Sequence, residues 1–558
     1  MALGLIAVAL IAALHLVAPR LGVAPQIILV AAGAAMSYLP GSSHFSLSPE
    51  IVLVGLLPLL LYASSLALPT IEFRRDLTAI GALSIALVMI TALGIGWVIH
   101  MLVPGLPLAI GVALGALISP TDAAATGIVK RLGLSSRVLA ILDGESLLND
   151  ASALVMARAG LAAAATGFSL LGAAESFIWA VVAAVGIGFV VGRLGVALRS
   201  RINSPAIASV VSLLVPFASY LPADLVRASG LVAVVAAGIT TRQASPGRLH
   251  AVQRMTEDAN WGTVEFLAEG IVFMAMGWQL KGLLTDLTLS NETYASTLLV
   301  AAIVWALALA MRAVFITGLV ALASSKVIRR QAVQNWWHRR DQASAVPGWL
   351  TGRFARVRIV LGRYAADIEY LIREPLHARE GVVLTWAGLR GVVTVAGAQM
   401  LPLDLPHRPL IVLIAYTVAV WSLLAQGLTL NPLARRLGLI DHDQTPLGEA
   451  DRLDDELESA ALTLLDSSPK RADGSPFDPA LLAGYKARMS AHPDDPTDSD
   501  SPLRAQFLEL RLMTISAERT ALLKARALGH YSSATLQHAL NRLDADELSA
   551  NLNLGDDT

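Results

Sequence analysis

The chain has no cysteine and little charge. Of its 558 residues, 15% are Asp, Glu, Lys or Arg, whereas ordinary soluble domains have about 25%. The missing cysteines exclude disulfides, thiolate nucleophiles and cysteine-ligated metals. The low charge, with 55% hydrophobic residues and a mean hydropathy of +0.61, indicates that most of the chain lies in lipid.

Charge is unevenly distributed along the chain. Residues 441–558 contain 22 Asp and Glu but 11 Lys and Arg, which leaves 21 and 31 in residues 1–440. We therefore divide the chain into a transmembrane domain with basic loops, 1–440, and an acidic soluble tail, 441–558. No basic segment precedes the first apolar run, so we expect a first membrane span there and no cleaved signal.

Apolar runs near the length that crosses a bilayer recur about thirteen times. Lys and Arg gather in every other connecting loop, from Arg20 after the first run to Arg435 and Arg436 after the last. Basic loops face the cytoplasm, so we predict an all-α membrane protein with its N-terminus outside and its C-terminus inside. The runs lie at about 2–18, 22–39, 51–68, 78–103, 107–129, 137–164, 171–198, 205–221, 228–240, 260–282, 294–324, 380–401 and 408–433.

Two soluble segments are expected on the cytoplasmic side. Trp336 and Trp337 lie among bases in a long loop, 325–378, which indicates either an amphipathic helix at the membrane surface or a solvated loop. The tail has helical stretches and no catalytic or nucleotide-binding motif, so we expect it to serve in regulation or assembly. The sequence does not identify its partner. No feature predicts binding of nucleic acid.

The fifth run contains the sequence GALISPTDAAATG. Pro120 removes a backbone hydrogen-bond donor, and Thr121 and Asp122 compete with the helix for hydrogen bonds. We therefore expect a broken helix whose freed carbonyls line an ion site. The alternative is a proline-kinked helix in which Asp122 pairs with a base.

The sixth run carries acidic residues deep within an apolar segment. Ser146 and Asp150 are four residues apart and share a helix face, and Glu145 and Asn149 share the adjoining face. A charge at the bilayer centre costs at least ~2.5–3.5 kcal/mol, so such acids need a cationic partner. Oxygens of Asp150 and Ser146 suit a small alkali cation such as Na⁺, and Thr121 from the broken run would complete its shell.

A lone arginine, Arg312, lies in the middle of the eleventh run. An unpaired guanidinium is expensive in lipid, and Glu145 needs a cation beside it. We therefore predict a buried Glu145–Arg312 ion pair that is structural and takes no part in transport.

Five sequence blocks in a fixed order resemble the monovalent cation/proton antiporters, in the electroneutral branch that includes NhaP-type sodium/proton exchangers. The resemblance covers nearly all of residues 1–440. The blocks are SPTDAAATGIVKRLG with ILDGESLLNDASALV, PFASYLPADLVRASGLVAVVAAG, NWGTVEFLAEGIVFMAMGWQL, TWAGLRGVVTVAGAQMLP and WSLLAQGLTLNPLARRLG.

The resemblance implies a NhaA-like fold, with thirteen spans in inverted repeats and broken helices that cross at the fifth and twelfth spans. It also implies a homodimer in the bacterial inner membrane. By the resemblance, Asp150 alternately holds cation and proton. The other residues of the ion site are then Asp122, Thr121, Ser146 and Asn149.

Two further assignments follow from the resemblance. Glu145 and Arg312 match the family's stabilising ion pair. Arg390, in GLRG, matches the broken twelfth span, where we expect its charge to compensate helix ends.

The chain departs from the family pattern at three places. Ala63 occupies a position where many relatives have a carboxylate, and Asp224 replaces a longer Glu. Glu265 matches a family Glu, but Glu269 replaces a common Asn. Asp224, Glu265 and Glu269 are therefore accessory acids, and Glu269 is either a further titrating group or a lumen-facing acid.

These observations predict an antiporter for pH homeostasis, with no enzymatic activity and no cofactor. One Na⁺, Li⁺ or K⁺, or one proton, neutralises Asp150, and the neutral site crosses by alternating access. Asn149 precedes it in place of a second acid, which predicts electroneutral one-for-one exchange. The alternatives are a cation channel and a transporter-like sensor that signals through the tail. No GxGD, HExxH or GxSxG motif lies beside these segments to support an intramembrane hydrolase.

Overall fold

The computed structural model describes residues 2–555 apart from 22, 40–47, 123, 167–169, 290–292, 342–366, 368–369, 373, 403–404, 406, 440–447, 472 and 490–501. Regular structure in these residues is helical, apart from an isolated bridge between Lys470 and Pro476. The predicted all-α class is therefore confirmed for this part of the chain.

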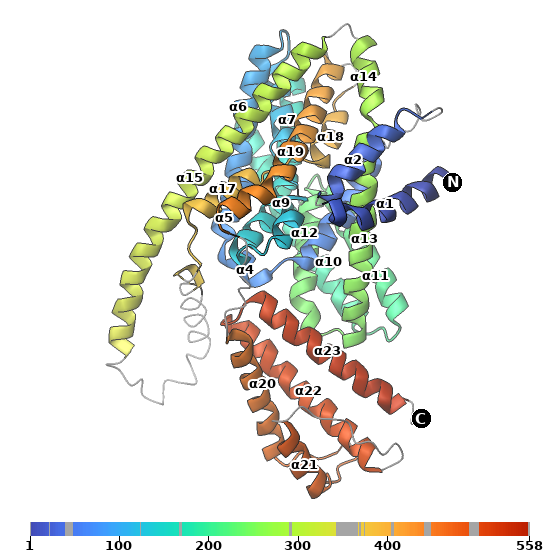
Figure 1. Cartoon of the computed structure of the whole chain (residues 1–558), viewed down its shortest axis with the longest axis vertical. Coiled ribbons are helices and arrows are strands. Elements are labelled where there is room, and N and C mark those ends of the chain that lie inside the picture. Colours follow the sequence, from blue (N-terminus) through green and yellow to red (C-terminus); the bar gives the residue numbers. More distant parts are fainter. Residues whose placement is uncertain are drawn as a thin grey trace.

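The helices of the membrane domain follow the predicted apolar runs (Figure 1). Helices α5, η3 and α6 are continuous, as are η2 and α3; η2 and η3 are π-helical. The elements are α1 (Ala2–Leu21), α2 (Pro25–Met36), η2 (Ile51–Leu56), α3 (Leu57–Ala67), α4 (Thr70–Arg75), α5 (Leu77–Gly81), η3 (Ala82–Leu87), α6 (Val88–Leu102), α7 (Leu108–Ile118), α8 (Ala124–Arg131), α9 (Ser136–Thr166), α10 (Leu170–Arg199), α11 (Pro205–Leu225), α12 (Gly230–Ala244), η4 (Ser245–Gly247), α13 (Ala251–Trp278), α14 (Leu280–Leu289), α15 (Tyr294–Asp341), α17 (Ala378–Trp386), α18 (Val392–Gln399) and α19 (Arg408–Arg436).

Five described helices are long and apolar enough to cross a membrane by themselves: Leu77–Leu102, Glu175–Arg199, Pro205–Leu225, Tyr294–Ala323 and Arg408–Arg436. Shorter apolar helices occur at Ile6–Ala18, Pro25–Met36, Ile51–Ala67 and Leu108–Ile118. Each predicted run coincides with a helix or a pair of helices. The total of about thirteen spans, and their arrangement as inverted repeats, stay predictions.

Two of the apolar runs are each divided into two helices. The fifth run forms α7 and α8, with a break that includes 119–122 around Pro120. The twelfth run forms α17 and α18, with a break at 387–391 that contains Gly388 and Gly391. Non-helical backbone at this depth needs polar partners inside the protein, because lipid supplies none.

Close helix packing brings backbone into contact with backbone in the membrane domain. Helices α2 and α13 meet at Gly33 and Gly277, where a Cβ on either glycine would lie 2.0 Å from a carbonyl oxygen of the other helix. Small residues permit this approach, and van der Waals contact then stabilises the pair without a hydrophobic driving force from lipid.

The predicted loop 325–378 begins differently in the structure. Helix α15 continues to Asp341 and is 48 residues long, so at 1.5 Å per residue it extends about 70 Å. Its far part projects away from the other helices (Figure 1). The apolar span within this helix, Tyr294–Ala323, ends close to residue 324 as predicted. The helix itself continues because residues 325–341 contain no glycine or proline to stop it. The basic segment 351–364 lies outside the described residues.

The tail forms a small helical bundle from α20 (Glu449–Asp466), α21 (Pro479–Met489), α22 (Pro502–Leu528) and α23 (Ser533–Gly555). Its apolar core includes Leu453, Leu457, Ile515 and Leu540, and Ile71 of the membrane domain packs against it. Figure 1 shows the bundle at one end of the membrane domain. We name that end the tail side.

Polar contacts join the tail bundle to the tail side of the membrane domain. Arg254 of α13 forms a buried ion pair with Asp544 of α23, in which Nε donates to Oδ2 at 2.8 Å. The Ser533 N–H donates to Glu72 Oε1 at 2.8 Å, and Arg75 donates to the carbonyl of Gly529. Buried charges need such partners, so the tail completes the polar surface of helices α4 and α13.

Candidate functional site

The two helix breaks lie against each other in the membrane domain. The Asp122 N–H donates to the carbonyl of Leu389 at 2.7 Å, and the Val392 N–H donates to Asp122 Oδ2 at 3.3 Å. Val392 is the first residue of α18, so the Asp122 carboxylate lies at the N-terminus of that helix. The positive end of the helix dipole and a free backbone N–H favour an anion at that position.

Arg390 lies at the opposite kind of helix end. Its Nε donates to the carbonyl of Ile118, the last residue of α7, at 3.3 Å, and its Nη1 donates to the carbonyl of Gly388, two residues past α17. Its backbone N–H donates to Ser422 Oγ at 2.6 Å. The C-terminal carbonyls of a helix carry partial negative charge, so this buried guanidinium lies where cationic compensation is needed.

The crossing leaves no room for a side chain at Gly391. A Cβ built there would lie 1.3 Å from Asp122 Oδ2. We expect Gly391→Ala to displace the carboxylate from α18 and to destabilise the membrane domain by about 1–3 kcal/mol, as overpacking does. Thermal unfolding in detergent measures this. Gly262→Ala is the matched control, since a Cβ there meets nothing within 4 Å; equal losses in both variants would contradict the tight crossing.

Helix α9 is bound to the break between α7 and α8 by polar side chains. Asn149 Nδ2 donates to Thr121 Oγ1 at 2.8 Å and to the Thr121 carbonyl at 3.3 Å. Thr121 Oγ1 in turn donates to Glu145 Oε1 at 3.2 Å. The sequence-predicted residues Thr121, Glu145 and Asn149 are thus brought together.

The structure also places Arg312 of α15 against Glu145. The two guanidinium nitrogens Nη1 and Nη2 bind the two carboxylate oxygens, the second at 2.9 Å. Arg312 Nε and Nη2 also donate to the carbonyl of Leu384, near the end of α17, at 3.1 and 2.8 Å. Both residues are 1% exposed. A bidentate, fully satisfied pair is the geometry that makes a buried ion pair tolerable.

Asp150 lies one helical turn beyond Ser146 on α9 and is 9% exposed. Among the described residues, none forms a hydrogen bond with its carboxylate. The carboxylate of Asp122 is close enough to act on it electrostatically. Two neighbouring carboxylates favour a bound cation or proton.

Further oxygens near Asp150 are available to a cation. Asn149 Oδ1 is buried and has no hydrogen-bond partner in the described part of the chain. Ser146 Oγ donates to the carbonyl of Asp143 at 3.1 Å, which leaves its lone pairs unused. Among described residues, no cluster of three His, Cys, Asp or Glu side chains is arranged to hold a metal. Neutral oxygens beside one or two carboxylates suit a monovalent cation.

The accessory acids are divided between two places. On α13, Glu269 accepts a hydrogen bond from Gln26 Nε2 at 2.7 Å, and Glu265 accepts one from Ser64 Oγ at 3.4 Å. Glu269 is within electrostatic range of Asp122. Asp224 instead forms an exposed ion pair with Arg158 at 3.4 Å, so the structure does not bring it into the site.

Sequence reasoning missed a second buried ion pair, between Arg199 and Glu257. Arg199 also donates to Ser212 Oγ at 3.1 Å, so the pair joins α10, α11 and α13. Arg199 directly follows the seventh predicted run, where basic loop residues are expected, and Glu257 precedes the tenth. The signal was an unpaired acid close to a predicted span, but the sequence gives no indication of which base it meets.

Comparisons with known proteins were made for the whole chain. A family model described as "Sodium/hydrogen exchanger, transmembrane" matches residues 6–436. An Escherichia coli protein named as an uncharacterized Na⁺/H⁺ exchanger, YjcE, is 30% identical, with 92% of each chain covered. A Bacillus subtilis sodium, potassium, lithium and rubidium/H⁺ antiporter is 26% identical, with 93% of this chain and 73% of the relative covered.

A solved structure resembles the fold. The sodium proton antiporter MjNhaP1 from Methanocaldococcus jannaschii, determined at pH 8, superposes with a TM-score of 0.54 at 17% identity. The match covers 77% of this chain and 97% of the solved chain. At this identity, the likeness supports the fold.

Proposed function

Because the chain belongs to the sodium/hydrogen exchanger family, we propose that it is a secondary antiporter that exchanges one monovalent cation for one proton at Asp150. Its relatives are named as exchangers and antiporters, which supports a multi-pass membrane transporter without enzymatic activity. They do not favour the two alternatives, a channel and a tail-signalling sensor.

The balance of charge around the crossing supports this proposal most strongly. Glu145 and Arg312 neutralise each other. The Asp122 carboxylate lies on the N-terminus of α18, and Arg390 lies at carbonyls near the ends of α7 and α17. The fractional charges of helix ends oppose both side chains. Among the described residues, Asp150 is then the charge that no neighbouring group neutralises.

Competition for Asp150 couples the two fluxes. One cation or one proton neutralises its carboxylate, and a neutral site crosses a low-dielectric barrier more readily than a charged one. Ser146, Asn149, Thr121 and Asp122 would supply oxygens to the cation. Alternating access exposes the loaded site to each side in turn. Since each loaded form has the same charge, the exchange is electroneutral.

The remaining features of the proposal concern placement and selectivity. Basic loops on alternate sides favour a cytoplasmic tail side and an external N-terminus in the bacterial inner membrane, and the family resemblance favours a homodimer. Glu265 and Glu269 would act as accessory acids near the site. Hard oxygens accept Na⁺, Li⁺ and K⁺ alike, so the proposal names monovalent cations as a class.

Proteoliposomes test the proposal. Purified protein is reconstituted with a pH-sensitive dye and an imposed pH gradient, and the chloride of each alkali metal is added in turn. We expect at least one cation to dissipate the pH gradient. The rate of dissipation should stay the same when the membrane potential is clamped at different values. Cation-independent dissipation would contradict antiport, and a rate that follows the potential steeply would contradict the one-for-one stoichiometry.

A further inference from the structure

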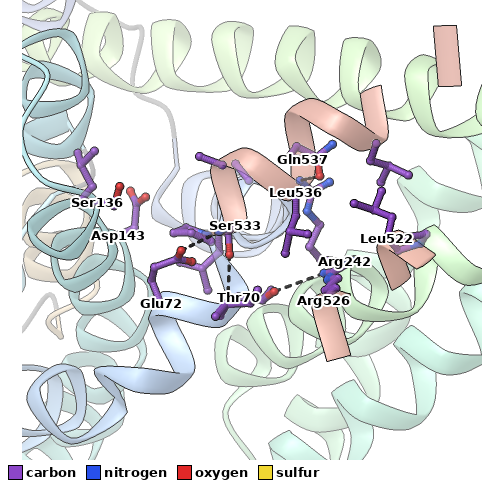
Figure 2. A pocket seen from close by; sticks show the side chains of 18 of the residues that line it. Thr70, Glu72, Ser136, Asp143, Arg242, Leu522, Arg526, Ser533, Leu536 and Gln537 are labelled. Atoms are coloured by element: carbon purple, nitrogen blue, oxygen red, sulfur yellow. Dashed lines mark hydrogen bonds between the residues drawn. The ribbon is translucent and has the colours of Figure 1, made fainter. Parts of the chain in front are cut away.

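A cavity of about 270 Å³ lies where the tail meets the tail side of the membrane domain. Figure 2 shows its lining, which combines residues of α4, α9 and α12 with residues of α22 and α23. It is separate from the ion site, since Asp122 and Asp150 do not line it. Its charged side chains are Glu72, Lys130, Asp143, Arg242 and Arg526.

Two arginines on one side of the cavity donate to neutral side chains. Arg242 donates to Gln537 Oε1 at 2.8 Å, and Arg526 donates to Thr70 Oγ1 at 3.4 Å; both acceptors are neutral. Arg242 also forms a long ion pair with the exposed Asp258, at 3.9 Å. Burial and the nearby Arg242 guanidinium lower the pKa of Arg526. An anion between the two guanidiniums would remove this repulsion.

The other side of the cavity offers an unused acceptor. Glu72 is 2% exposed, and its Oε1 accepts the Ser533 N–H, whereas Oε2 has no hydrogen-bond partner within the described part of the chain. Figure 2 shows Glu72 directed towards Ser533, at the N-terminal end of α23. A buried carboxylate oxygen without a donor is costly, so a ligand hydroxyl in the cavity would stabilise it.

The remaining charges do not oppose an anion. Lys130 and Asp143 pair with each other at 3.3 Å. The cavity therefore has three bases and two acids, a net positive charge that is concentrated at Arg242 and Arg526.

We propose that this cavity binds a small phosphate ester that carries hydroxyl groups. The phosphate binds Arg242 and Arg526, whose planar guanidiniums form paired hydrogen bonds with phosphate oxygens, and a hydroxyl donates to Glu72 Oε2. The volume lies just below the range of about 300–1,000 Å³ for drug-sized ligands, which fits a glycerol phosphate. Such a ligand contacts both α12 and α22 and so holds the tail against the membrane domain.

Binding to the full chain in phosphatidylcholine nanodiscs tests the proposal. Isothermal titration calorimetry at fixed sodium is run with glycerol 3-phosphate, inorganic phosphate and glycerol. We expect saturable binding of the first two and none of glycerol. Because no ion gradient is present, this result is independent of exchange activity.

Single-residue variants locate the binding. Arg242→Gln and Arg526→Gln should each weaken binding of both phosphates about tenfold or more, as loss of a charge-assisted contact does. Lys524→Gln, at an exposed position on α22, removes the same charge and should leave binding unchanged. Glu72→Gln keeps the acceptor for Ser533, and it should weaken glycerol 3-phosphate but not inorganic phosphate. Elution as a single species on size exclusion shows that each variant is folded.

A phosphate ester with hydroxyl groups occurs both in soluble metabolites and in lipid headgroups. Repeating the titration in phosphatidylglycerol nanodiscs separates the two sources. If glycerol 3-phosphate binds in both kinds of disc, the site holds a soluble ligand. If its binding is lost only in phosphatidylglycerol discs, the lipid headgroup already occupies the site. Absence of binding in phosphatidylcholine discs would overturn the proposal, as would an equal loss with Lys524→Gln.

Discussion

Replacing Asp150 with asparagine is expected to reduce cation-driven proton flux to the level of protein-free liposomes. Asparagine has nearly the same shape but neither binds a proton at physiological pH nor attracts a cation by charge. The Asp150 carboxylate has no hydrogen bond with any described residue, so its replacement leaves the surrounding contacts intact. Dye dequenching in proteoliposomes after addition of each alkali chloride measures the loss.

A second acid on the same domain provides the matched control. Asp224 is exposed and forms an ion pair with Arg158, outside the crossing. Asp224→Asn makes the same chemical change, and we expect it to retain exchange within about twofold, since exposed ion pairs contribute at most ~1 kcal/mol. Sodium-driven proton flux that persists in Asp150→Asn would falsify the assignment of the transport site.

Arg312→Ala is expected to destabilise the membrane domain by about 3–5 kcal/mol. Removing one member of a buried ion pair leaves the other charge in a low-dielectric environment without a partner. The cost also includes the hydrogen bonds that Arg312 donates to the carbonyl of Leu384. Yield of folded protein and the midpoint of thermal unfolding in detergent are the measurements.

Two comparisons separate a structural role from a transport role for this pair. Arg158→Ala removes an exposed arginine, whose side chain is 57% exposed, and should change the unfolding midpoint little. The double variant Glu145→Gln, Arg312→Gln leaves no bare charge and should recover part of the stability. An unchanged unfolding midpoint in Arg312→Ala, together with lost competition between cation and proton, would contradict the structural role.

The local features of the site were predictable because helix geometry determines them. A proline and two hydrogen-bonding side chains near residue 120 predicted the break between α7 and α8. Spacing of four residues predicted which groups of α9 share a face. The same reasoning located the end of the apolar span near residue 324, but it left open whether the following residues are helical. In the structure the helix continues to Asp341. Hydropathy indicates where the chain leaves the lipid. A helix instead ends at a residue, such as glycine or proline, that disfavours helical backbone geometry.

Contacts between distant segments were harder to predict from the sequence. The Glu145–Arg312 contact could be anticipated because few charges occur in the lipid-spanning part of the chain, so each has few candidate partners. The capping of α18 by Asp122, and the contact of Arg390 with Ser422, involve polar groups with many candidate partners. Nothing in the local sequence distinguishes the correct one.

The amino-acid sequence alone determined which charged groups lie in lipid, where a helix breaks, and how side chains are arranged along one helix. These properties depend on transfer free energies and on backbone geometry over a few residues. Tertiary structure alone decided that Asp122 lies on the N-terminus of α18, 270 residues away along the chain. It alone decided that Glu72, Arg242 and Arg526 enclose one cavity. Those arrangements result from packing of entire helices, whose relative positions depend on the summed contacts of many residues.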